Sequence, residues 1–172
     1  ITPNTVFHAA SLSKQFTAYA ILLLEKEGKL SLNDDIRKYI PEVPNFGKKI
    51  TLLHLASHQS GLRDQWRLLH MGGWRPDDVI LTEDILDLVS RQTDLNFAPG
   101  TKLMYSNTGF TLLAEVVTRV SGQSFAEFTQ ERIFTPLGMT HSQFYDDYEK
   151  IVKNRAYSYE NEDGKLKKSK LC

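Results

Sequence analysis

Residues 10–18 read ASLSKQFTA and contain the only Ser-x-x-Lys of the chain, formed by Ser11 and Lys14. Apolar residues follow this motif at three- and four-residue steps, and Gly28 stands where a helix would stop. Such a pattern is typical of an amphipathic helix with a glycine stop signal. The sequence therefore predicts one helix from about Ser11 to Glu27, with the serine at its first turn.

A serine and a lysine at this spacing can act together. A lysine three residues along a helix lies one turn away on the same face, within reach of the Ser11 hydroxyl. That hydroxyl is a poor nucleophile until a base removes its proton. The positive end of the helix and burial both disfavour an ammonium, which favours Lys14 as a neutral base. Alternatively, Ser11 is a helix cap and Lys14 is a solvated surface residue. The motif alone leaves both interpretations open.

A second short pattern, Tyr105-Ser106-Asn107, directly precedes a helix expected to begin at Thr108. It presents a phenol and an amide where a loop becomes a helix. Tyr105 could relay a proton between the nucleophile, the lysine and a leaving group. The amide of Asn107 could orient the substrate and the lysine. Alternatively, Tyr105 is a half-buried packing residue and Asn107 is a helix N-cap, because that arrangement would have the same sequence.

The rest of the chain is expected to be mainly helical, with one β-hairpin and with residues 61–78 as a loop. Acidic residues in a first turn, a capping box and glycine stop signals support the helices, and an Asp-Gly turn supports the hairpin. Further helices are expected from Thr51 through Ala56, from Thr82 through Val89, from Thr108 to Val120 and from Ser124 through Ile133. The hairpin strands are expected at Ala156–Tyr159 and Leu166–Lys168, around Asp163-Gly164.

Composition excludes several classes of function. The 172 residues fit one domain, and 21 Lys and Arg balance 21 Asp and Glu, so no overall basic field favours nucleic acid. The apolar run Ala18–Leu24 is too short to span a membrane. One cysteine, Cys172, excludes an internal disulfide framework and a cysteine zinc cluster. His54 and His58 lie four apart, but Leu55 stands where a zinc protease needs its glutamate. We expect no metal and no cofactor.

Taken together, these patterns resemble the penicillin-recognising serine hydrolases, which comprise class C β-lactamases, D,D-carboxypeptidases and related esterases and amidases. The resemblance covers almost the whole chain, and the order and spacing of its pieces are more specific than any single piece. Beyond residues 10–18, the pieces are EGKL (27–30), LNDD (32–35), YIPE (39–42), ITL (50–52), HQSGL (58–62), PGT (99–101), YSN (105–107) and PLGM (136–139).

The resemblance implies a role for each matching residue. Ser11 corresponds to the acylated serine, Lys14 to its base partner, and Tyr105 and Asn107 to the Tyr-x-Asn element. Because the group that takes the serine proton is disputed in Ser-x-x-Lys enzymes, the role is assigned jointly to Lys14 and Tyr105. The backbone N–H of Ser11 would be one oxyanion donor.

The third element of this family, a Lys-Thr-Gly or His-x-Gly on a late strand, is missing from the sequence. His70-Met71-Gly72 has the right letters but lies between the first two elements, in a stretch expected to be a loop. The resemblance implies an α+β fold of β-lactamase/transpeptidase type, with a helical lobe and a lobe built on an antiparallel sheet. We expect residues 1–172 to be a partial domain, mainly the helical lobe, with the remaining sheet strands outside this chain or in another chain.

The implied function is hydrolysis of an amide or ester, in a small molecule or a peptide, through a covalent acyl-enzyme. The HQSGL segment favours the esterase, D-aminopeptidase and carboxypeptidase-like group over dedicated β-lactamases. A different hypothesis is a binding or assembly module that keeps the fold without turnover. If sheet strands are missing, apolar residues of two helices should lack a partner surface. These residues are Phe16, Tyr19, Leu23, Leu112 and Val116.

Overall fold

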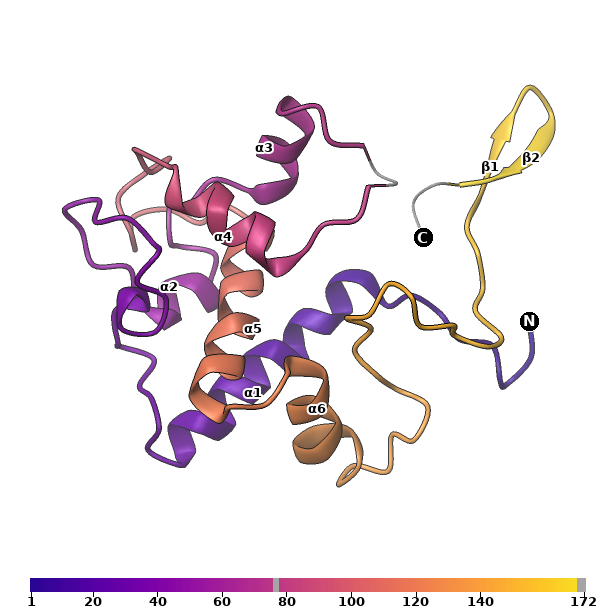
Figure 1. Cartoon of the computed structure of the whole chain (residues 1–172), viewed down its shortest axis with the longest axis horizontal. Helices are drawn as coiled ribbons and strands as arrows, with labels where there is room; N and C mark the ends of the chain where they lie inside the picture. The colour runs from indigo at the N-terminus through magenta and orange to yellow at the C-terminus, as the bar shows by residue number, and fades with distance from the viewer. Residues whose placement is uncertain (76–77, 170–172) are drawn as a thin grey trace.

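The computed structural model describes residues 1–75 and 78–169, which are mainly helical (Figure 1). A single two-stranded antiparallel sheet accompanies the helices in these ranges. The fold is therefore α+β with the helical part dominant, as the sequence predicts. In chain order the elements are the 3₁₀ turn η1 (Ala10–Ser13), α1 (Lys14–Lys26), the 3₁₀ turn η2 (Ile36–Lys38), α2 (Leu52–Ala56), α3 (Gln65–Met71), α4 (Thr82–Ser90), α5 (Asn107–Ser121), α6 (Phe125–Thr129), the π-helical turn η3 (Gln130–Phe134), β1 (Tyr159–Glu162) and β2 (Lys165–Lys168).

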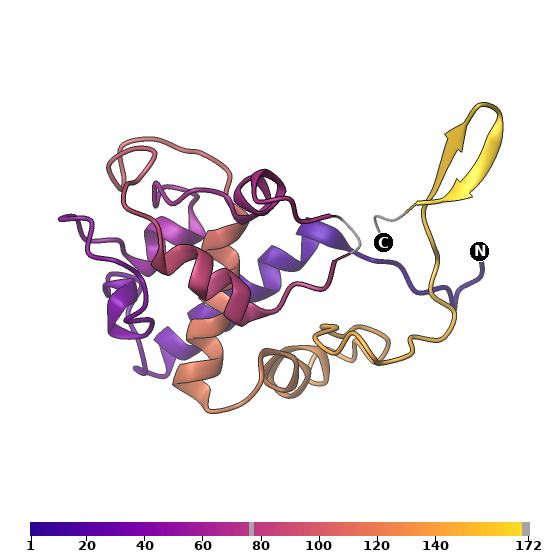
Figure 2. The ribbon, with the colours of Figure 1, turned by 45° about the horizontal axis from the view of Figure 1, so that its top comes forward.

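Helix α5 lies at the centre of the helices and packs against α1, α2, α4 and α6 (Figures 1 and 2). The centre of its apolar stripe, which includes Leu112 and Val116, is buried in one core with Ile21 of α1. Gly109 allows the close contact with α2, because a Cβ there would lie 3.2 Å from the carbonyl oxygen of Leu55. The α5 packing thus fixes where the N-terminal ends of these helices lie.

The expectation that Leu112 and Val116 lack a partner was wrong, since both are fully buried. The chain covers them itself, because α5 is surrounded by the neighbouring helices. On α1, the ring of Phe16 is partly buried and packs edge-on against Phe134 of η3, with 5.1 Å between ring centroids. Leu23 is also partly buried against the core, and Tyr19 alone of the five is classed as exposed, at 46%.

The expectation of a loop over residues 61–78 was also wrong in part. Helix α3 occupies two turns of this range and buries Leu69. Asp64 caps it by accepting a hydrogen bond from the Trp66 N–H at 3.1 Å. A helix this short is stable only through packing and capping, here through contacts with α4 and α5, so its own periodicity was too weak to predict it.

The other helices were correctly predicted to within a few residues. Thr51 caps α2 and Ser124 caps α6, each in a capping box. Gly122 ends α5 in the left-handed conformation, at φ 74°. The first helix differs at its start, where residues 10–13 form a 3₁₀ turn before α1 begins at Lys14.

The hairpin forms around the predicted turn, but its first strand begins three residues later than expected. Asp163 and Gly164 both have positive φ, 51° and 79°, as a two-residue hairpin turn requires. This turn places Glu162 opposite Lys165, so β1 runs over Tyr159–Glu162. The hairpin extends away from the helices in both views (Figures 1 and 2).

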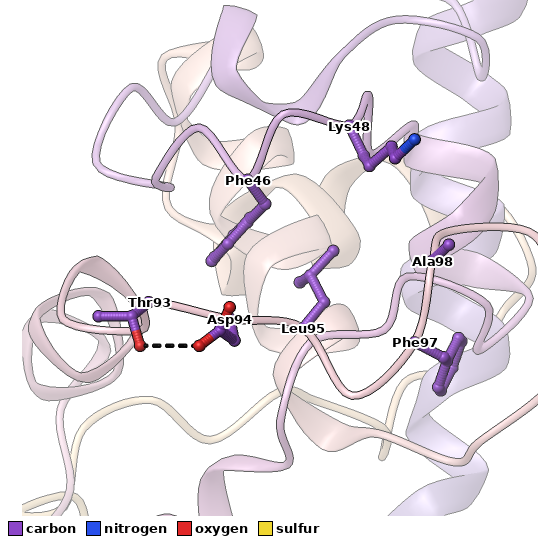
Figure 3. Close-up of a pocket in the computed structure, with 7 residues that line it drawn as sticks. All are labelled: Phe46, Lys48, Thr93, Asp94, Leu95, Phe97 and Ala98. Carbon is purple, nitrogen blue, oxygen red and sulfur yellow. Dashed lines mark hydrogen bonds between the residues drawn. The ribbon is translucent and has the colours of Figure 1, made fainter.

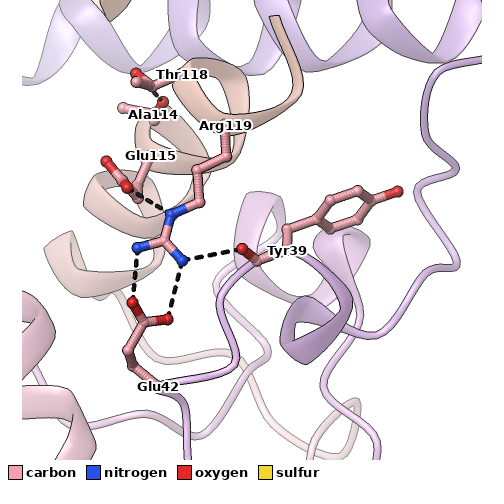
Figure 4. Close-up of polar contacts among 6 residues, drawn as sticks. All are labelled: Tyr39, Glu42, Ala114, Glu115, Thr118 and Arg119. Carbon is pink, nitrogen blue, oxygen red and sulfur yellow. Dashed lines mark hydrogen bonds and ion pairs between the residues drawn. The ribbon is translucent and has the colours of Figure 1, made fainter. Parts of the chain in front are cut away.

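Arg119 of α5 binds the segment that follows η2 to the outside of the helix (Figure 4). Its guanidinium donates to both carboxylate oxygens of Glu42, at 2.8 and 2.9 Å, to Glu115 at 2.6 Å and to the carbonyl oxygen of Tyr39 at 3.1 Å. The pairing with Glu42 raises the pKa of Arg119 and lowers that of Glu42.

Among the described residues, no helix has both the length and the apolar character needed to cross a membrane.

Two glycines with similar backbone angles allow a matched test of the packing. Gly61 has φ 77°, and a Cβ there would lie 2.2 Å from the carbonyl oxygen of Phe97, whereas Gly47 has φ 67° and open space around it. Gly47→Ala should cost about 1–2 kcal/mol through backbone strain alone. Gly61→Ala should cost roughly 3 kcal/mol or more, because backbone must also move. Urea unfolding of both variants measures the difference, and equal losses would contradict the close contact at Gly61.

Candidate active site

The structure brings Ser11, Lys14, Tyr105 and Asn107 into one hydrogen-bonded cluster. The Ser11 Oγ lies 2.7 Å from the hydroxyl of Tyr105. The Lys14 Nζ donates to Ser11 Oγ at 3.1 Å and to Asn107 Oδ1 at 2.9 Å. Residues more than 90 positions apart meet here because α1 packs directly on α5. Hydrogen bonds therefore connect all four residues singled out in the sequence, with Lys14 linking Asn107 to Ser11 and Tyr105.

The placement of Ser11 and Lys14 differs from the cap-and-surface alternative. Ser11 lies inside η1 rather than at the N-cap, and its hydroxyl bonds to Tyr105 and Lys14. Lys14 is half-buried, with its Nζ 5.0 Å from the ring centroid of Tyr105 and 5.7 Å from that of Phe110. The preceding residue, Ala10, has φ 46°, a strained conformation for a residue with a side chain. The serine is presented on a tight, strained turn.

Tyr105 is half exposed and is electrostatically coupled to the lysine. The Lys14 amine beside its hydroxyl lowers the pKa of Tyr105, and the hydrogen bond with Ser11 lowers it further. The negative charge of Asp64 acts in the opposite direction. A phenol whose pKa is lowered in this way ionises more readily, and its phenolate form is the one that can accept a proton from a neighbouring hydroxyl. Lys14 and Tyr105 together therefore provide a path for the Ser11 proton.

His58 supports the Tyr-Ser-Asn segment from one side. Its Nδ1 accepts a hydrogen bond from the Ser106 N–H at 3.2 Å, and its ring lies 4.5 Å from the ring of Tyr105. His58 itself has a positive φ of 58°, and its carbonyl accepts from the Met104 N–H. The role of His58 at this site was not predicted, although the HQSGL segment that contains it was recognised in the sequence.

Asp64 supports the same segment from the other side and was also missed. Its Oδ2 accepts from both the backbone N–H and the side-chain Nδ2 of Asn107, at 2.6 and 2.9 Å. An aspartate before a short helix would have been recognisable as an N-cap of α3. The contact with Asn107, 43 positions along the chain, had no signal in the sequence.

The histidines considered for metal binding have separate roles. The Nδ1 of His54 accepts from the Thr51 N–H within the cap of α2, whereas His58 bonds to Ser106. Within residues 1–75 and 78–169, no group of three or more His, Cys, Asp or Glu side chains is arranged to hold a metal ion. Cys172 lies outside the described residues.

The third family element is not found on the described strands, since β1 reads YENE and β2 reads KLKK. His70-Met71-Gly72, which has the letters of this element, lies at the C-terminal end of α3 rather than on a strand.

A separate cavity of about 230 Å³ is lined by none of the four clustered residues. Its lining consists of Phe46, Lys48, Thr93, Asp94, Leu95, Phe97 and Ala98 (Figure 3).

Comparison with known proteins agrees with this fold. A family model described as Beta-lactamase matches residues 1–170. The chain belongs to the Beta-lactamase family.

Individual members of the Beta-lactamase family match most of this chain. Penicillin-binding protein 4* of Bacillus subtilis is 38% identical over 148 residues, which cover 83% of this chain and 31% of that protein. A D-aminopeptidase of Brucella anthropi is 36% identical over 148 residues, 86% of this chain and 28% of that protein. The chain thus spans about a third of the length of these curated relatives.

Solved structures of the family match the whole arrangement of elements. The octameric penicillin-binding protein homologue from Pyrococcus abyssi superimposes with a TM-score of 0.82 at 32% identity, covering 97% of this chain and 39% of that one. The family and the β-lactamase/transpeptidase-like fold that the sequence resembles are confirmed.

Burial of His58 in this Beta-lactamase-family site makes stability depend on pH. Burial lowers the pKa of His58, and the nearby Lys14 charge adds to the effect; burial also lowers the pKa of His54. The unfolded chain, with a histidine pKa near ~6.5, therefore takes up protons before the folded one as the pH falls. The stability that neutral His58 contributes should be complete above about pH 6.5 and should be lost below it.

The variant His58→Asn removes this titrating group with a residue that tolerates positive φ. Between pH 7 and pH 5, wild type should lose more free energy of unfolding than His58→Asn, as followed by urea unfolding at each pH. The same loss in both proteins would show that His58 does not contribute to the acid side of the stability profile.

Proposed function

We propose that this protein is a serine hydrolase that cleaves an amide or ester through a covalent acyl-enzyme on Ser11. The observation that carries the proposal is the position of the Ser11 Oγ, which contacts both the Tyr105 hydroxyl at 2.7 Å and the Lys14 Nζ at 3.1 Å. A nucleophile in hydrogen-bond contact with its base, and a base held by a third group, is the arrangement that covalent catalysis needs.

In the acylation step, Ser11 Oγ attacks the substrate carbonyl carbon while its proton passes to the Lys14 and Tyr105 pair. The carbonyl oxygen becomes an oxyanion, for which the backbone N–H of Ser11 is one donor. The same pair then returns the proton to the leaving amine or alcohol as the carbonyl–leaving-group bond breaks. In deacylation, water attacks the ester of Ser11, and the pair takes the water proton and gives it to the departing Ser11 Oγ.

Asn107 orients the lysine during these transfers, because its Oδ1 accepts from Lys14 Nζ. A lysine held by one fixed acceptor and one reacting hydroxyl has few other positions available. The side chain of Asn107 is half-buried at the first residue of α5, so it also lies where it can contact substrate. No metal and no cofactor is needed for this sequence of steps.

We propose further that residues 1–172 form part of a β-lactamase-related domain. A second oxyanion donor would come from a Lys-Thr-Gly or His-x-Gly strand in the same protein or in another chain. The lengths of the matched relatives support this proposal, since the chain covers about a third of each. The D-aminopeptidase relative supports peptide amides as substrates, and the HQSGL segment favours this group over dedicated β-lactamases.

The first test is labelling of the nucleophile in the intact protein. A fluorophosphonate should add its phosphonyl mass to the peptide that contains Ser11, as measured by mass spectrometry after digestion, and a β-lactam should acylate the same residue. Ser11→Ala should remain unlabelled. Ser13→Ala, a change two residues away in the same turn, is the matched control and should label like wild type. Equal labelling of Ser11→Ala and wild type would rule out Ser11 as the nucleophile.

The second test concerns the base. Lys14→Ala and Tyr105→Phe should each lower kcat/KM for ester hydrolysis by ~10²-fold or more, the usual contribution of a general base. The double variant should lose far less than the product of the two effects, because the residues act as one unit. Steady-state kinetics of the three variants measure both points. A Lys14→Ala protein with near-normal rates would return Lys14 to the role of a surface residue.

A further inference from the structure

The Asp64 carboxylate is hydrogen-bonded to the starts of two helices and to the side-chain amide of Asn107. Its Oδ1 accepts from the Trp66 N–H at the start of α3, and its Oδ2 accepts from the backbone N–H and the Nδ2 of Asn107 at the start of α5. Resting on the function proposed above, we propose that Asp64 is the positioning residue that fixes the Asn107 amide, and through it Lys14, for proton transfer.

The contact with Asp64 matters because the two sides of the Asn107 side-chain amide differ chemically. A primary amide has an acceptor oxygen on one side and a donor NH₂ on the other. With Nδ2 directed to the Asp64 carboxylate, Oδ1 must face Lys14, as observed at 2.9 Å. The flipped amide would place its oxygen against a carboxylate and its NH₂ against an amine that donates. Asp64 therefore selects one of the two orientations, and only that orientation holds the lysine.

The start of α5 depends on Asp64 because its own N-cap residue does not act as a cap. Ser106 occupies the N-cap position without a side-chain cap bond. Within the described part of the chain, its buried hydroxyl has no hydrogen-bond partner. Asp64 instead supplies a carboxylate to the first N–H of the helix from a different segment, where the positive end of the helix dipole favours negative charge. The same contact holds Tyr105, two residues earlier, at the site.

Other bonds hold the junction of α3 and α5 when the Asp64 carboxylate is changed. The Gln65 N–H donates to Thr108 Oγ1 at 2.8 Å, and that hydroxyl donates to the Arg63 carbonyl at 2.8 Å. Thr111 also donates to the side chain of Gln65. A variant of Asp64 can therefore keep the helices in place while losing control of the amide.

The test variant is Asp64→Asn in the intact protein. Asparagine caps a helix as well as aspartate does, so the cap of α3 is kept. It offers one acceptor where aspartate offers two, so it cannot serve Trp66 and both donors of Asn107. Asp35→Asn is the matched control, because Asp35 caps η2 through the Arg37 N–H in the same way. Thermal unfolding of both variants shows how much protein is folded.

For ester hydrolysis, Asp64→Asn should lower kcat roughly 10- to 100-fold, the scale of a small misplacement of a catalytic group. KM should change less than kcat, because the main effect is on proton transfer. Removing the negative charge also removes an effect that opposes the lowering of the Tyr105 pKa, so the limb of the kcat/KM profile that reports Tyr105 should move to lower pH. Asp35→Asn should match wild type in rate and pH profile.

A double-variant comparison separates positioning from general damage. In an Asn107→Ala background, Asp64→Asn should cause a much smaller further loss than in wild type, because most of its effect passes through the amide. An additive loss, an unchanged rate and pH profile, or a loss that only follows the folded fraction would each overturn the proposal. The proposed function fails separately, if wild type is not acylated at Ser11. In that case, hydrogen exchange of the Asn107 side-chain NH₂ by NMR still decides the inference, since exchange should be faster in Asp64→Asn.

Discussion

The hydrogen bond between Lys14 and Asn107 depends on the packing of α1 against α5. It joins the first residues of these two helices. The apolar faces of the two helices are buried together, with residues such as Ile21 and Val116 fully covered. Because helices are rigid along their length, burial of these faces also fixes the first turns, where the polar residues lie. A displacement of one helix by one turn, about 5.4 Å, would separate the lysine from the amide and from Tyr105. The core thus sets the geometry of the candidate site.

The site uses two kinds of support that differ in strength. Apolar packing of α5 is distributed over many residues and tolerates a single conservative change. The polar supports, His58 and Asp64, are single side chains whose loss leaves donors of the Tyr-Ser-Asn segment without partners. Changes to the core should therefore affect stability first, whereas changes to these two residues should affect the site while most of the fold remains.

Much of this structure was predictable from sequence because its signals are local. Capping boxes at Thr51 and Ser124, the glycine stop at Gly122 and the Asp-Gly turn each act within a few residues, and each marked its element. The motif residues of the site were recognised by their order along the chain. Helix α3 and the role of Asp64 were not predicted, because both depend on contacts with α5 more than forty positions away. The burial of Leu112 and Val116 on α5 was misjudged for the same reason. An apolar stripe shows that a helix needs a packing partner, but it does not show which segment provides that partner.

Three helix starts lie around the cluster of Ser11, Lys14, Tyr105 and Asn107. Ser11 lies in the turn that leads into α1, Asp64 caps α3, and Asn107 is the first residue of α5. The positive ends of three helices therefore meet at one group of side chains. Under the function proposed above, such a field would favour negative charge on the Tyr105 oxygen and on the oxygen of a carbonyl that Ser11 attacks. The Asp64 carboxylate balances part of the field and also accepts from the Asn107 amide. The packing that buries the core therefore also brings these helix starts together around Ser11, and the proposed role of this serine depends on that packing.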